Sequence, residues 1–122
     1  MNDTEKPQFL LLLRNPYSAG GAGPSPEEMQ HIMARFAQWM ATLRATDSVV
    51  GTNGLEQHAG AVLRGSGGAT VTDGPFVEAK EIVGGYILIR TDDLPQAIEI
   101  ARGCPGLDFQ LSVEVRPVKT HG

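Results

Sequence analysis

The sequence has few of the features that mark secreted, nucleic-acid-binding or membrane-spanning proteins. A single cysteine, Cys104, allows no internal disulfide, which agrees with a reducing compartment. Ten Lys and Arg against 14 Asp and Glu give a net charge of −4, and no basic patch gathers for phosphate binding. The apolar run at residues 9–13 is far shorter than the roughly 20 residues of a membrane helix, and nothing frames it as a signal peptide. We expect a cytoplasmic protein that binds neither nucleic acid nor a membrane.

The length and composition are those of one globular domain. The chain has 122 residues, of which 41% are hydrophobic and 20% charged, and a domain of this size buries roughly two-thirds of its unfolded surface. We expect a disordered N-terminal tail at residues 1–8, a single domain at 9–118 and a C-terminal tail at 119–122.

The first half of the domain reads as a strand, a loop and a long helix. The run Phe9–Arg14, ended by Asn15-Pro16, predicts a buried central strand. The loop over 15–24 is rich in glycine but lacks the spacing of a phosphate-binding loop, so we expect a flexible connection. Ser25, Pro26 and Glu28 then form the capping box of a helix.

One face of that helix is an apolar stripe, and His31 lies on the opposite, polar face. Three methionines in a stripe can form an adaptable binding groove, but this spacing is more typical of core packing, which we expect here. The stripe comprises Met29, Ile32, Met33, Phe36, Met40 and Leu43, with Trp39 on its border.

The second half alternates between strands and a shorter helix. Residues 48–55 predict an irregular strand broken at Gly51–Asn53, and 61–64 with 69–72 predict a hairpin around a glycine-rich turn. Residues 86–90 predict a strand, followed by a helix that an Asp caps and that Gly103 ends. The strict alternation over 109–116 predicts a half-buried last strand, ended by Pro117.

This order of elements predicts an α+β ferredoxin-like sandwich with an extra β-hairpin and both helices on one sheet face. Apolar residues fall on both faces, with Phe9, Leu11 and Leu13 on one side and Leu10, Leu12, Ile87 and Ile89 assigned to the other. Because two helices can cover only one face, we expect a homodimer that buries the second.

The segment from Ala69 to Tyr86 concentrates the candidate chemistry around the Gly74-Pro75 turn. Asp73 either fixes this turn through backbone amides or also acts on a ligand as an acid or base. Lys80 is either a solvated charge or a partner for an anionic group of the substrate.

Four more side chains are candidates for a site or for the core. His58 lies near a strand end, where an imidazole suits acid-base work, although an ordinary surface histidine is the simpler interpretation. Phe76 and Tyr86 could line an apolar pocket, with Phe76 otherwise anchoring the turn. Cys104 has no neighbouring base and is predicted to be structural. No histidines share metal-ligand spacing, so we expect no metal or cofactor.

The motif Thr-Asp-Gly-Pro-Phe-Val-Glu-Ala-Lys-Glu at residues 72–81, followed by Gly84-Gly85-Tyr86, resembles the DGPF subgroup of the YCII-related family. Segments 25–29, 92–97 and 113–118 are similar to the family pattern as well, so the resemblance covers nearly the whole chain. It implies a dimeric α+β barrel built from ferredoxin-like subunits.

The resemblance also implies a site. The wider YCII superfamily is thought to include small-molecule enzymes with a His and Asp pair, and Asp73 fits the acidic member. Phe36 stands where YCII-type members carry the histidine on the first helix, so His58 is the hypothetical replacement.

Two functions follow, and the sequence leaves open whether the protein is an enzyme. One is a small-molecule-binding dimer with acid-base catalysis of a lyase or isomerase type. The other is a non-catalytic accessory domain that contacts a protein such as an extracytoplasmic-function sigma factor, because DGPF members often occur beside such factors.

Overall fold

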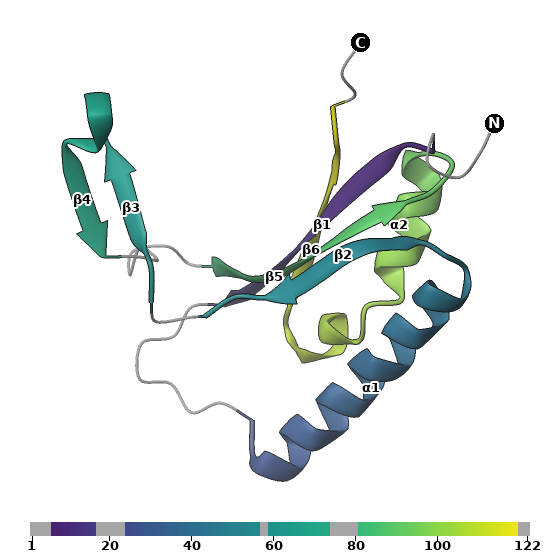
Figure 1. The fold of residues 1–122 in the computed structure, drawn as a ribbon. Coiled ribbons are helices and arrows are strands. Elements are labelled where there is room, and N and C mark those ends of the chain that lie inside the picture. The colour runs from purple at the N-terminus through teal and green to yellow at the C-terminus, as the bar shows by residue number, and fades with distance from the viewer. Residues whose placement is uncertain (1–5, 17–23, 57–58, 74–80, 120–122) are drawn as a thin grey trace.

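A four-stranded antiparallel sheet carries both helices of the protein on one of its faces (Figure 1). The structure is a computed structural model that describes residues 6–16, 24–56, 59–73 and 81–119. The sheet has the order β2-β5-β1-β6, and β3 and β4 form a separate two-stranded sheet. The elements are β1 (Gln8–Pro16), α1 (Pro26–Ala45), β2 (Val49–Gly54), β3 (Ala61–Arg64), β4 (Thr70–Asp73), β5 (Glu81–Arg90), α2 (Leu94–Arg102) and β6 (Ser112–Pro117).

The strand order follows from two strand-helix-strand units that interleave in one sheet. The helix α1 connects β1 to β2, and α2 connects β5 to β6, while β1 and β5 lie together in the centre. The β1–β5 ladder runs antiparallel from Gln8 opposite Arg90 to Pro16 opposite Glu81. This α+β arrangement is consistent with the predicted ferredoxin-like fold.

Both helices begin where their capping residues predict, and α2 also ends at the predicted Gly103. The Ser25 hydroxyl accepts a hydrogen bond from the Glu28 amide at 3.1 Å, and the Glu28 carboxylate accepts one from the Ser25 amide at 3.3 Å. At α2 the Asp93 carboxylate accepts from the Gln96 amide at 2.9 Å, and Gly103 is the C-cap. Each side-chain cap satisfies an amide that the first helical turn leaves without a partner.

The core lies between the helices and the central strands. Leu11 and Ile89 are fully buried, and burying such a side chain contributes roughly 2–3 kcal/mol. Because the same cluster includes residues of both helices, α1 and α2 cover the same face. Its members are Phe9, Leu11, Trp39, Leu43, Ile87, Ile89, Ala97, Ala101 and Cys104.

The assignment of Ile87 and Ile89 to the uncovered face was wrong. Ile89 pairs with Phe9 and Ile87 pairs with Leu11, so all four side chains face the helices. Directly opposed residues of an antiparallel ladder share a face, and β-strand alternation fixes the rest. The uncovered face instead carries Leu10, Leu12, Tyr86 and Leu88, which are half-buried.

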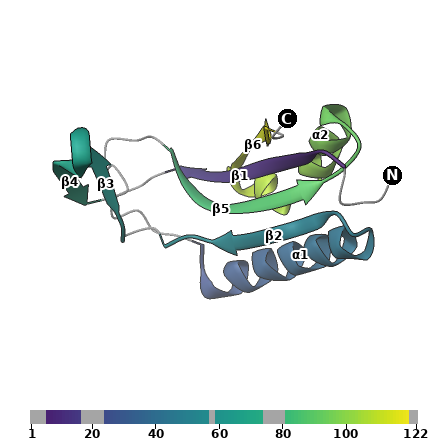
Figure 2. The ribbon, with the colours of Figure 1, turned by 45° about the horizontal axis from the view of Figure 1, so that its top comes forward.

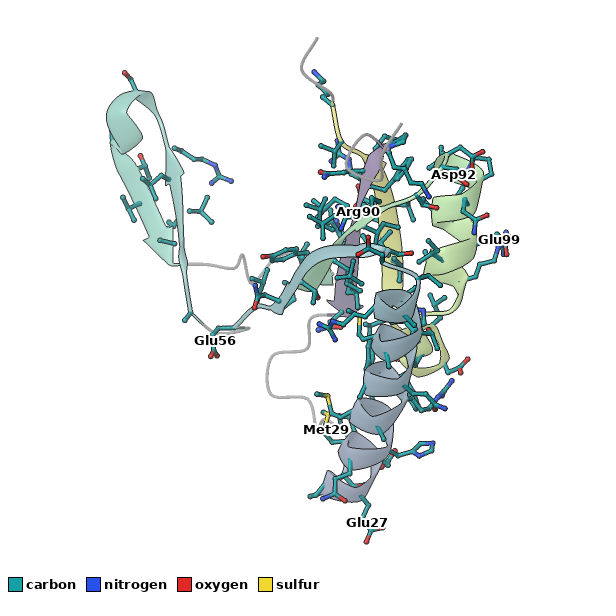
Figure 3. The ribbon with its side chains drawn as sticks, turned by 45° about the vertical axis from the view of Figure 1, so that its right-hand side comes forward. Glu27, Met29, Glu56, Arg90, Asp92 and Glu99 are labelled. Carbon is teal, nitrogen blue, oxygen red and sulfur yellow. The ribbon has the colours of Figure 1, made fainter. Side chains whose placement is uncertain are left out.

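The apolar stripe of α1 was predicted to pack in the core, but only part of it does. Met29 and Met33 are 42% and 59% exposed, whereas Trp39, which we placed on the border of the stripe, is buried. Figure 3 shows Met29 at the end of α1 that lies farther from α2. The second half of α1 therefore makes the core, and the first half does not. His31 is exposed, as predicted.

Two strands differ from their predicted form. The strand β2 continues unbroken from Val49 to Gly54, because a register shift between Val49 and Gly51 absorbs the irregularity. Phe109 belongs to a 3₁₀ turn and not to β6, since Gln110 has a φ of 70°, a left-handed conformation that no strand accommodates. The strand β5 begins at Glu81, five residues before the predicted start.

The predicted hairpin is confirmed, and it stands apart from the four-stranded sheet in both ribbon views (Figures 1 and 2). Leu63 pairs with Val71 across it, and each is 61% exposed. An isolated two-stranded sheet with so little burial adds no second core to the domain.

Cys104 provides a test of the core. Burial raises the pKa of its thiol, so the unfolded thiol, with a pKa of about 8.5, ionises at a lower pH than the folded thiol. Its contribution to stability is complete below the unfolded pKa and is lost as the pH rises through the folded pKa. The stability advantage of wild type over Cys104→Ala should therefore shrink between pH 7 and about pH 10. Urea unfolding of both proteins measures it, and a constant difference would contradict the prediction.

Candidate functional site

A cavity of about 430 Å³ lies between the middle of α1 and the neighbouring end of the sheet. Its described walls come from α1, from β1, β2 and β5, and from the segment before β6. The lining residues are Leu13, Asn15, Met33, Phe36, Met40, Thr52, Asn53, Gly54, Gly84, Gly85, Tyr86, Ile87 and Leu111.

Three residues of α1 form an apolar wall. Met33, Phe36 and Met40 border the cavity at the spacing of one helix face. The Phe36 ring meets the Trp39 ring edge-on, with centroids 6.2 Å apart and planes at 71°, so packing against the core holds it. Met33 is exposed enough to change rotamer as a ligand enters, because methionine is flexible.

On the sheet side, the cavity is bordered by glycines, which have no side chains to fill the space beside α1. Gly54 pairs with Gly85 in neighbouring strands, and Gly84 has no partner in β1, because the register shifts between Leu13 and Arg14. This is a β-bulge with one extra residue in β5. Without side chains at these positions, the sheet surface lies farther from α1, and the space remains open.

The three glycines differ in how much room a side chain would find. A Cβ on Gly84 would collide with Nδ2 of Asn15, and one on Gly85 would lie 3.2 Å from the Asn53 carbonyl oxygen. A Cβ on Gly54 would meet only the Gly84 carbonyl oxygen, at an ordinary 3.9 Å. Gly54 is therefore the position where a side chain can fill the cavity without forcing the backbone apart.

Two polar side chains of β2, next to the cavity, are hydrogen-bonded to β5. The Thr52 hydroxyl donates a hydrogen bond to the Tyr86 carbonyl oxygen at 2.8 Å, which ties β2 to β5. The Asn53 amide nitrogen donates to the Tyr86 hydroxyl at 3.2 Å. Since Ile87 faces the helices, strand alternation directs the Tyr86 ring to the other face. Tyr86 thus borders the cavity with its backbone.

The sequence-predicted site is described only in part. His58, Phe76 and Lys80 lie outside the described residues. Asp73 is the last residue of β4 and pairs with Ala61, but its side chain is not described. The roles assigned to these four residues, and the ligand-binding role of Tyr86, stay predictions.

Sequence reasoning missed most of the cavity. The methionine groove was weighed and set aside in favour of core packing, yet Met33 and Met40 both line it. Asn15 was interpreted only as the end of a strand and Gly54 only as part of another, and neither was predicted as a site residue. The signal that could have found it is the pair Gly84-Gly85 in a strand together with the apolar face of the first helix.

Neither a metal centre nor a membrane helix is found where the structure describes the chain. No three His, Cys, Asp or Glu side chains among the residues of the described ranges gather as metal ligands would. No helix in the same part of the chain combines the length and the apolarity that crossing a membrane requires.

A comparison with known protein families establishes the family of the chain. Residues 6–120 match the YCII-related domain. The chain belongs to the YCII-related family. No curated protein matches the sequence closely. The family assignment confirms the broader part of the resemblance seen in the sequence and covers both helices and all strands of this YCII-related domain.

Proposed function

We propose that this YCII-related protein, as a member of the DGPF subgroup, binds a small organic molecule in the cavity between α1 and the sheet. The observation that carries the proposal is the cavity of about 430 Å³ with its apolar helix wall and glycine floor. Small-molecule sites are typically apolar hollows of this size with a few polar groups.

The position of Phe36 supports this choice. By the family resemblance, Phe36 stands where YCII-type members carry a histidine, and Phe36 lines the cavity. The histidine at this position is the proposed catalytic group of YCII-type members. The cavity that Phe36 lines is therefore the expected place for the ligand. With Phe36 in place, the helix supplies this wall with apolar surface in place of a proton-transfer group.

The binding proposal can be tested at Gly54. Valine at this position should fill the cavity and weaken binding of N-phenyl-1-naphthylamine, an uncharged fluorescent probe, at least tenfold, with little loss of stability. The matched control is Ala37→Val, on the exposed surface of α1, at a residue that does not line the cavity. Fluorescence titration measures the affinities.

Equal affinity of wild type and Gly54→Val, or no saturable binding to wild type, would overturn the proposal. Absence of binding would favour the alternative function, a non-catalytic accessory domain that contacts a protein such as a sigma factor.

The catalytic part of the proposal concerns Asp73 and His58, with Lys80, Phe76 and Tyr86 as contacts for the ligand. A carboxylate that takes up a proton and an imidazole that returns it would perform the acid-base step of a lyase or isomerase. Asp73 supports this by its place at the end of β4, where the chain leaves the hairpin for β5.

Replacing Asp73 by Asn should abolish turnover, because an amide cannot accept the proton. Wild type and variant can each be incubated with a cellular extract of small metabolites and the products followed by mass spectrometry. Asp92→Asn is the control, since that exposed carboxylate pairs with Lys6 at 3.5 Å at the start of α2. A metabolite consumed by wild type and by Asp73→Asn alike would contradict the catalytic role.

We further propose that a second copy of this chain covers the open face of the sheet, completing a dimeric α+β barrel. The face carries an apolar row of Leu10, Leu12, Tyr86 and Leu88. Beside it, β6 carries charges of both signs, Glu114 and Arg116, which approach each other at 3.8 Å. Glu114 also pairs with Arg14 of β1 at 3.0 Å. A face with an apolar centre and both charges at its edge can complement itself across a two-fold axis.

Introducing a carboxylate in that row should give a monomer. Leu12→Glu places a charge directly opposite Glu114 in the β1–β6 ladder, where like charges repel. Light scattering should give the mass of a dimer for wild type and for Ile98→Glu on the exposed surface of α2, and of a monomer for Leu12→Glu. Leu10→Lys, on the same face, provides a second variant, and a monomeric wild type would overturn the proposal.

A further inference from the structure

Asn15 occupies a distinctive place in the cavity wall. It is the last residue but one of β1, and it lies opposite Ile82. Alternation along β1 puts Asn15 on the same face as Leu11 and Leu13, toward the helices. The amide of Asn15 lies against Gly84, where any side chain would collide with it. The bulge at Gly84 therefore makes room for this amide.

The side chain of Asn15 has hydrogen-bonding capacity that the described residues do not use. Thr52 and Asn53 both donate hydrogen bonds to Tyr86. The described ranges offer the Asn15 amide no such partner, although it has two donor hydrogens and an acceptor oxygen. A ligand in the cavity can meet it as donor, acceptor or both.

Charge is missing from the described part of the cavity wall. None of the lining residues among the described ranges is acidic or basic. The nearest charged residue in β1 is Arg14, which pairs with Glu114 and alternates to the open face. An ion moved into such a wall loses hydration without gaining a counter-ion, which is costly.

We propose that the part of the ligand held between α1 and the sheet is uncharged, with an apolar body and one hydrogen-bonding group that the Asn15 amide recognises. This inference rests on the proposed function, because it names the chemical class that the same cavity takes. Met33, Phe36 and Met40 contact the body, and Asn15 selects the head group.

Three probes that share a naphthalene ring test it. 2-Naphthamide carries a neutral hydrogen-bonding head, 2-naphthoate a negative charge, and 2-methylnaphthalene neither. We expect 2-naphthamide to bind about tenfold more tightly than the other two, which corresponds to one well-placed hydrogen bond. Isothermal titration at neutral pH measures the three affinities.

Substitution of Asn15 should remove the preference and keep the binding. Asn15→Leu should lower the affinity for 2-naphthamide to that for 2-methylnaphthalene, whose own affinity stays unchanged. Gln38→Leu removes an exposed amide from α1 and is the matched control. Gly84→Ala, which displaces the Asn15 amide, gives a second variant with the same expected loss of preference.

The outcomes separate this inference from the proposed function. If 2-naphthoate binds as tightly as 2-naphthamide, or if Asn15→Leu keeps the preference, the inference is overturned and binding in the cavity stands. If none of the probes binds saturably, both are overturned.

Discussion

The burial of the central β1–β5 ladder beneath the two helices is the interaction on which the rest of the structure depends. Leu11 opposite Ile87 and Phe9 opposite Ile89 supply its apolar centre. Trp39 and Leu43 fix the second half of α1 upon it. The same packing holds in place the helix face of Met33, Phe36 and Met40, which borders the cavity opposite the glycines of the sheet.

The fold was largely predictable because its signals are local. Ser25 with Glu28 and Asp93 with Pro95 mark helix starts by chemistry that acts within one turn. The hairpin follows from a glycine-rich turn between two short strands. The faces of β5 could not be assigned in the same way, because Ile87 and Ile89 alternate correctly on either side. Only their pairing with β1 decides the face.

The site was less predictable because the cavity exists where glycines of the sheet provide no side chains to fill it. The charged segment before β5 drew attention as chemistry, and the motif it contains identified the family. Gly84 and Gly85 contributed to the family resemblance, but neither they nor Gly54 indicated a cavity, because their effect depends on α1 lying opposite them. Met33 fits the helical period of a core residue but is exposed and borders the cavity. Periodicity reports which face a residue occupies and says nothing of what lies beyond it.

The bulge at Gly84 has a meaning beyond local geometry. On either side of it Ile82, Val83 and Gly85 face Asn15, Arg14 and Leu13 in order, so a chain that lacked Gly84 would form a regular ladder with every other pair unchanged. The β1–β5 ladder itself thus does not depend on this residue, whereas the Gly84 carbonyl oxygen accepts a hydrogen bond from the Leu55 amide at 2.9 Å on the β2 side. The same residue leaves space for the Asn15 amide, because a Cβ on Gly84 would collide with it. A variant that lacks Gly84 would therefore show separately what this residue contributes to folding of the sheet and to binding in the cavity.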